Sequence, residues 1–117
     1  MRAMPWDVSL PEKRNSGSRL AGEVLGEAVA ALDGWLLVDG ETAITKSFTF
    51  PSFGMAFAFM TSAALQAERM DHHPEWSNLF NRVDVRLVSH DAAGVTERDL
   101  ALARYMDHVA VAFRASR

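Results

Sequence analysis

Three of the four histidines of this 117-residue chain lie in one short stretch, between Glu68 and Asp99. His72 and His73 are adjacent, and His90 follows further along. Histidine has an unperturbed pKa of about 6.5, so its side chain can both give and take a proton near neutral pH. Positioned imidazoles of this kind typically contribute about 10²–10⁴-fold to a rate through general acid–base catalysis. The sequence therefore predicts a proton-transfer site in this stretch.

Two carboxylates flank the histidines, and each has two interpretations. Glu68 stands four residues before His72, so the two side chains share a face if the segment is helical. Contact there would orient the ring and favour its charged form, or would be an ordinary surface ion pair of little energetic value. Asp99 completes a Thr96-x-x-Asp99 pattern typical of a capping box, in which the later side chain bonds back to the first amide. Asp99 can cap a helix and still line the site.

The histidines also have structural alternatives. A pair at the end of a helix can simply be solvated, because cationic groups there interact well with the helix dipole. His90 has the parity of Asp84 and Arg86, off the core face of a strand, which suits either a site residue or a surface histidine. A zinc site is a third possibility, but helical metal pairs usually use a spacing of three or four residues rather than adjacent histidines such as His72 and His73.

The whole pattern resembles that of the pterin-4a-carbinolamine dehydratases. The family pattern has an acidic or polar residue, then three residues, His-His-Pro, an aromatic residue, a histidine on a second strand and an aspartate. The corresponding positions here are Glu68, His72-His73-Pro74, Phe80, His90 and Asp99. The spacing is kept throughout, and the resemblance extends over most of the chain.

This resemblance implies an enzyme that removes water from a 4a-hydroxytetrahydropterin and gives the quinonoid dihydropterin, as in tetrahydrobiopterin recycling. No metal and no other cofactor is implied. An acid must protonate the leaving hydroxyl while a base accepts the proton of N5. We expect His72, beside Glu68, to be the main donor and His90 to be the acceptor, with His73 contacting substrate or tuning its neighbour. The implied catalytic residues are His72, His73 and His90, and the implied substrate-binding or supporting residues are Glu68, Trp76 and Asp99.

Other implications of the resemblance concern partners. The expected partner molecule is a small pterin, and Trp76 either forms a wall for its flat ring or belongs to the core. Homodimers or homotetramers are expected, because members of the family associate with one another. The alternative function is a protein-binding or transcriptional-coactivator module that keeps the family fold.

Composition narrows the functional classes. The net charge of −3 argues against a standing nucleic-acid surface, which needs a clustered excess of Lys and Arg. The absence of cysteine excludes disulfides and thiolate chemistry. Apolar runs fall short of the roughly 20 residues of a membrane helix, and the N-terminus lacks the apolar core of a signal peptide. These features together lead us to expect a cytoplasmic protein.

The elements that must position the histidines follow the order helix, two strands, helix, two strands, helix. We expect residues 1–16 to be a poorly ordered lead-in and residues 17–117 to form a single domain. Alternation in the strands predicts a four-stranded antiparallel sheet covered on one face, so the fold class is α+β with three helices packed on that face. The resemblance implies the same fold.

Local signals give approximate boundaries. A first helix is expected from about Ser18, and Asp39-Gly40 indicates a two-residue type I′ hairpin turn. Ser52 is a candidate N-cap for the second helix, which should end near Asp71 because Pro74 disfavours a helical residue before it. The apolar positions expected to be buried are Leu20, Val24, Ala28 and Ala31 in the first helix, Phe53, Phe57, Met60, Ala64 and Ala67 in the second, and Leu102, Met106, Val109 and Phe113 in the last.

Overall fold

The computed structural model describes residues 17–114, which form three helices, four strands and one short 3-10 turn. The elements in chain order are α2 (Gly22–Ala30), β1 (Leu36–Val38), β2 (Ala43–Thr49), α3 (Phe53–Met70), β3 (Glu75–Leu79), β4 (Arg82–Leu87), η1 (His90–Ala92) and α4 (Glu97–Arg114). This order confirms the predicted fold class. The expected lead-in, residues 1–16, lies outside the described residues, and the single domain from 17 to 117 stays a prediction.

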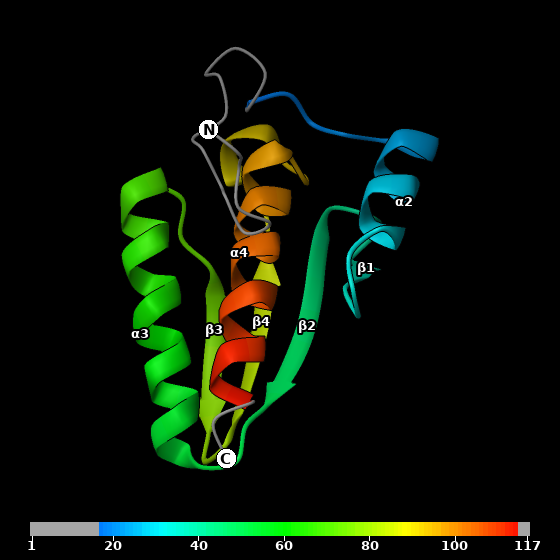
Figure 1. Ribbon diagram of the computed structural model, residues 1–117. Coiled ribbons are helices and arrows are strands. Elements are labelled where there is room, and N and C mark those ends of the chain that lie inside the picture. Colours follow the sequence, from blue (N-terminus) through cyan, green and yellow to red (C-terminus); the bar gives the residue numbers. More distant parts are fainter. Residues whose placement is uncertain (1–16, 115–117) are drawn as a thin grey trace, which may run out of the picture.

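The strands form one antiparallel sheet in the order β1-β2-β4-β3. Side chains alternate between the two faces of a strand. The register places Ile44 opposite Leu87 and Phe48 opposite Val83, and all four of these side chains are fully buried. Figure 1 shows α3 and α4 side by side across this face and α2 next to β1. The helices therefore cover one face, as the alternation predicts.

One charged residue lies on the covered face and is satisfied there. Lys46 Nζ contacts Asp107 Oδ1 of α4 at 2.7 Å and stands 4.8 Å from the centroid of the Phe48 ring. The indole Nε1 of Trp35, which is buried, donates to the same Oδ1 at 3.0 Å. Buried charges are tolerated when they are paired and hydrogen-bonded. Asp107 thus ties α4 to the first hairpin.

The hairpin between β1 and β2 has a longer turn than expected. Val38 pairs with Ala43, so the turn comprises residues 39–42 rather than Asp39-Gly40 alone. A type I′ turn requires two residues with positive φ. Asp39 and Gly40 meet that condition, but Glu41 also has a positive φ, of 66°. The prediction of a hairpin is confirmed, and the two-residue length is wrong.

The second helix is in the predicted place, with its buried face rotated from the predicted one. Ser52 caps α3 by accepting a hydrogen bond from the Met55 amide at 3.1 Å. Phe53 and Phe57, expected to be buried, are 49% and 55% exposed, whereas Phe59 is fully buried. A rotation of one residue is about 100° on a helix. Apolar side chains occur on nearly all sides of α3, so periodicity alone did not identify the correct face.

The first helix shows a similar error. It begins at Gly22 rather than near Ser18. Val24 is 63% exposed, while Leu25 and Val29 are buried. Leu20 and Ala28, expected to be buried, pack partly buried against the core. In α4 the prediction is better, because Leu102 and Met106 are fully buried, and Val109 and Phe113 pack partly buried against the core. Within residues 17–114, no helix has the length and apolarity that crossing a bilayer requires.

Candidate active site

The end of α3, the turn after β4 and the start of α4 all lie at one end of the molecule, as Figure 1 shows. α3 stops after Met70, where Asp71 adopts a left-handed conformation with φ of 50°. Its amide still bonds back to the helix, while His72 and His73 continue outside it. His90 opens η1, three residues after the end of β4. The topology therefore gathers the predicted site residues from three separate elements.

His72 and Asp99 form a buried imidazole–carboxylate contact. His72 Nε2 lies 2.6 Å from Asp99 Oδ1. His72 is 7% exposed and Asp99 is fully buried. The other carboxylate oxygen, Oδ2, accepts hydrogen bonds from Ser89 Oγ at 2.8 Å and from the Thr96 amide at 2.9 Å. Asp99 therefore caps α4 as the capping-box pattern predicts and holds His72 at the same time.

The hydroxyl groups around Asp99 have a consistent direction of donation. A hydroxyl has one proton to donate. Ser89 Oγ gives its proton to Asp99, so Thr96 Oγ1 donates to Ser89 Oγ across 2.8 Å. Thr96 Oγ1 in turn accepts from the Arg98 amide at 3.2 Å. The carboxylate that faces His72 is thus held in one orientation.

The two ring nitrogens of His72 differ in their contacts. Nε2 is occupied by Asp99, which leaves Nδ1. The His72 side chain keeps a small exposed fraction, 7%. A ring whose far nitrogen is held by a carboxylate is oriented and has its tautomer set, as a general acid or base requires.

The predicted contact between Glu68 and His72 is wrong. Glu68 Oε1 lies 2.9 Å from His73 Nε2, and both side chains are largely exposed, at 77% and 58%. The helix ends before His72, so the spacing of four residues no longer places the two side chains on one face. His72 turns inward to Asp99 instead, and Glu68 supports His73.

His90 has a carboxylate partner that the sequence reasoning missed. Its Nε2 lies 2.7 Å from Glu75 Oε2. The other oxygen, Glu75 Oε1, accepts from Arg86 Nη1 at 2.6 Å. The pKa of Glu75 is lowered from its ordinary value, first by the hydrogen bond from His90 and next by that from Arg86. The predicted place of His90 off the core face is confirmed, with 77% of its side chain exposed.

The register of β3 on β4 is the signal that could have identified Glu75. The β3–β4 pairing places Glu75 directly opposite Arg86, on the face away from the helices. His90 follows the same strand three residues after Leu87 and reaches back toward β3. β3 and β4 are joined by a turn at Phe80 and Asn81. Counting outward from it would have paired Glu75 with Arg86.

Asp91, next to His90, forms an ion pair with Arg98 of α4. Its carboxylate accepts from Arg98 Nη2 at 2.8 Å. The pKa of Asp91 is lowered, mainly by this hydrogen bond from Arg98, and the His72 charge also contributes. The interior imidazole is therefore near enough to η1 to affect it.

The two aromatic candidates, Trp76 and Phe80, lie in different surroundings. Trp76 is partly buried, packs against the core and pairs with Val85 in the sheet, which agrees with the core alternative. Phe80, the aromatic position of the motif, lies in the turn at the far end of β3 and is 65% exposed. A strand the length of β3 spans about 16 Å. Phe80 is therefore remote from Glu75, which lies at the other end of that strand.

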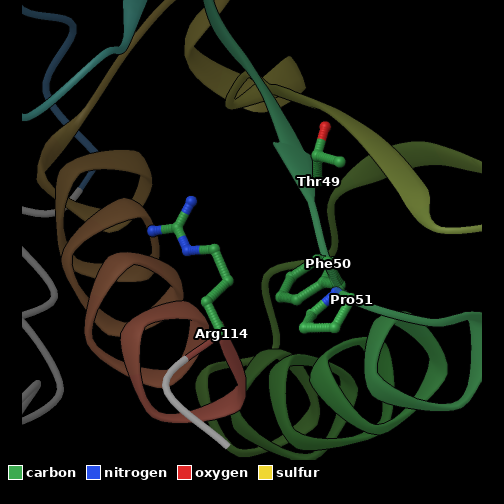
Figure 2. Close-up of a pocket in the computed structure, with 4 residues that line it drawn as sticks. All are labelled: Thr49, Phe50, Pro51 and Arg114. Atoms are coloured by element: carbon green, nitrogen blue, oxygen red, sulfur yellow. The ribbon is translucent and has the colours of Figure 1, made fainter. Parts of the chain in front are cut away.

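One hollow lies away from this cluster. It has a volume of about 250 Å³ and lies where β2 ends and α4 finishes. Figure 2 shows the residues that line it, Thr49, Phe50, Pro51 and Arg114. Residues 17–114 contain no group of three or more His, Cys, Asp or Glu side chains arranged to hold a metal ion.

Comparisons with known proteins point to one family. The family model for pterin 4 alpha carbinolamine dehydratase matches residues 18–109. Relatives from Brucella ovis and Brucella melitensis biotype 1, which carry the provisional name pterin-4-alpha-carbinolamine dehydratase, are each 55% identical over 93 residues, covering 80% of this chain and 96% of their own. A crystal structure described as a transcriptional coactivator/pterin dehydratase from Brucella melitensis matches with a TM-score of 0.77 and 55% identity, over 80% of this chain and 99% of that one. With the family model covering most of its length, this chain belongs to the pterin 4 alpha carbinolamine dehydratase family.

Proposed function

We propose that the protein dehydrates 4a-hydroxytetrahydropterins to the quinonoid dihydropterin, in the recycling of tetrahydrobiopterin. The observation that carries this proposal is the His72–Asp99 contact, in which a buried carboxylate holds an imidazole at 2.6 Å at the same end of the molecule as two exposed histidines. Family membership supplies the substrate class.

The reaction needs two proton transfers. The bond between C4a and its hydroxyl oxygen breaks as that oxygen receives a proton and leaves as water. The N5–H bond gives up its proton as the C=N bond forms. Both groups must work near neutral pH, and imidazoles satisfy that condition.

We assign the donor role to His72. Asp99 occupies its Nε2 and orients the ring, as a general acid requires. The proton is then delivered from Nδ1 to the leaving hydroxyl. Asp99 thus takes the supporting role that the sequence assigned to Glu68.

We assign the acceptor role to His90 and a substrate-contacting role to His73. Both rings are mostly exposed and can meet a substrate that docks at this end of the molecule. Arg86 shares the Glu75 carboxylate with His90, which reduces the charge that acts on the ring. A neutral His90 is the form that can take the N5 proton.

A turnover assay with a synthetic 4a-carbinolamine tests the proposal. Dehydration also proceeds without a catalyst, so the rate is compared with the buffer alone and with the His72→Ala/His90→Ala double variant. We expect the wild-type protein to accelerate the reaction and EDTA to leave the rate unchanged. Loss of activity in EDTA favours a metal site, and a wild-type rate equal to the background removes the proposed activity.

Self-association is the second part of the proposal. The outer face of α3 exposes Phe53 and Phe57, whose rings lie 5.7 Å apart, together with Leu65, which is 65% exposed. Exposed apolar groups gathered on one element favour a protein contact. We propose a homodimer or homotetramer, and light scattering at micromolar concentration that gives the 12.9 kDa of one chain would contradict it.

A protein-binding or coactivator role is the alternative function. The same exposed face of α3 supports it, and the related Brucella melitensis protein is described as a transcriptional coactivator/pterin dehydratase. Such a role does not require the histidines. Variants that lose His72 and His90 would therefore keep a binding function and lose the dehydratase function.

A further inference from the structure

We propose that Glu75 is a positioning residue for His90, and that Arg86, held by Asp39, limits how strongly Glu75 acts on the ring. This inference rests on the proposed dehydratase function for its effect on rate. The underlying contacts are independent of that function.

The first step is the position of the Glu75 carboxylate. It lies at the start of β3, and its two oxygens serve different partners, Oε2 for His90 Nε2 at 2.7 Å and Oε1 for Arg86 Nη1 at 2.6 Å. Since Nε2 is occupied, Nδ1 is the nitrogen of His90 that remains for a substrate. The contact therefore decides which nitrogen does the chemistry.

The second step is the anchor behind Arg86. Its Nε and Nη2 both contact Asp39 Oδ2, each at 2.8 Å, from the turn between β1 and β2. Arg86 is 35% exposed and Glu75 is 45% exposed, while the His90 side chain is 77% exposed. A side chain as exposed as His90 has many accessible rotamers, and a partner fixed by a second ion pair restricts them.

The third step concerns charge. Two charged groups face His90 from the sheet, Glu75 from β3 and, behind it, Arg86 from β4. The third is its neighbour Asp91, which forms an ion pair with Arg98 of α4. The Glu75 carboxylate is the anion in direct contact with the ring. Arg86 competes for that anion, so removing Arg86 and removing Glu75 must affect His90 in opposite directions.

Solvent can reach this chain of contacts. A hollow of about 240 Å³ on the outer face of the sheet is lined by Glu75 and Arg86, along with Thr45, Trp76, Ser77, Asp84 and Val85. Changes at Glu75 or Arg86 thus affect a surface network and leave the buried core intact. Folded variants are expected for both positions.

The first experiment follows the His90 ring by NMR, through the titration of its Cε1 proton in the full-length protein. In Glu75→Gln we expect the midpoint to move to lower pH by a few tenths of a unit, as for an exposed ion pair. In Arg86→Gln we expect it to move to higher pH. The matched controls are Asp84→Asn and Arg82→Gln, which remove the same charges from the neighbouring ion pair on the same face. Equal midpoints in all variants, or movement in one direction for both, overturn the proposal.

The second experiment measures dehydration by the same variants. We expect Glu75→Leu, which removes the acceptor, to lower kcat by about 10-fold with little change in KM, and Glu75→Gln, which keeps an acceptor, to retain most of kcat. In Glu75→Gln, the pH at which the rate changes should move in the same direction as the NMR midpoint of His90. Equal kcat in Glu75→Leu and Asp84→Asn overturns the positioning role. If the wild-type protein does not accelerate dehydration, the proposed function fails, while the NMR result still decides the contacts.

Discussion

The site contains two imidazole–carboxylate contacts, one in the interior and one on the surface. His72 meets Asp99 in the interior, where the carboxylate has 0% exposure and both of its oxygens are bonded. His90 meets Glu75 on the surface, with 77% and 45% of the side chains exposed. Water screens the second contact and hardly reaches the first. One carboxylate–imidazole contact is therefore part of the fold, and the other is adjustable.

The strongest test of this contrast is Asp99→Ala. The change leaves Ser89 Oγ, the Thr96 amide and His72 Nε2 without their acceptor in the interior. We expect the free energy of unfolding to fall by about 3–5 kcal/mol, because breaking a buried pair from one side is costly. Urea denaturation measures it, and Asp91→Ala serves as the exposed control, with little expected change. A loss below about 1 kcal/mol for Asp99→Ala would show that the interior contact is not part of the fold.

Removing the imidazoles tests whether His72 and His90 act in the same step. We expect His72→Ala and His90→Ala each to reduce kcat by at least about 10²-fold, with smaller changes in KM. The double variant should be little worse than the poorer single variant, because both groups act in the same step. Steady-state kinetics corrected for the uncatalysed rate measures this. Near-normal kcat in both single variants would contradict the acid–base assignment even with the fold intact.

A smaller effect is expected at the exposed Glu68–His73 contact. Glu68→Gln should change the free energy of unfolding by less than about 1 kcal/mol, since exposed ion pairs contribute little. Activity should stay within a few-fold of wild type. Thermal unfolding and the turnover assay check both values. A large loss of kcat would mean that Glu68 supports the reaction directly and that the contrast between interior and surface is misplaced.

The smallest effect concerns acid pH and Glu75. Its pKa lies below the ordinary value of 4.5 because His90 and Arg86 donate to the carboxylate. A depressed pKa contributes stability that is present above the unfolded value and is lost as pH falls through the folded value. Wild type should therefore exceed Glu75→Gln in stability at pH 7, and the two should converge as pH falls below 4.5. Denaturant unfolding at several pH values checks this, and a difference that grows in acid would reverse the sign.

The fold and the identity of the histidines were accessible from the sequence, because they depend on local patterns. The order of elements, the Ser52 cap and the Asp99 capping box all follow from neighbouring residues. The buried faces of the helices could not be predicted in the same way, because α3 has apolar side chains on nearly every side. Phe57 and Phe59 are equally apolar, and only packing distinguishes the exposed ring from the buried one.

The partners of the histidines were the part that the sequence could not provide. Spacing assigned Glu68 to His72, but the helix ends at Met70 and the ring turns toward a residue from α4. Glu75 reaches His90 only through the register of β3 on β4. Contacts between distant segments depend on where elements end, which is the least predictable feature of a local pattern.

The Lys46–Asp107 contact has a consequence for alignment at the site. Asp107 and Asp99 lie on the same helix, α4. Their separation in sequence corresponds to about 12 Å along the helix axis. A slip of α4 by a single residue would move Asp99 by about 1.5 Å, which is enough to break its 2.6 Å contact with His72. Lys46 and Trp35 hold Asp107 in place, so the axial position of the helix is set from the sheet. The contact between Asp99 and His72 therefore depends on Lys46 and Trp35, which hold Asp107 of the same helix.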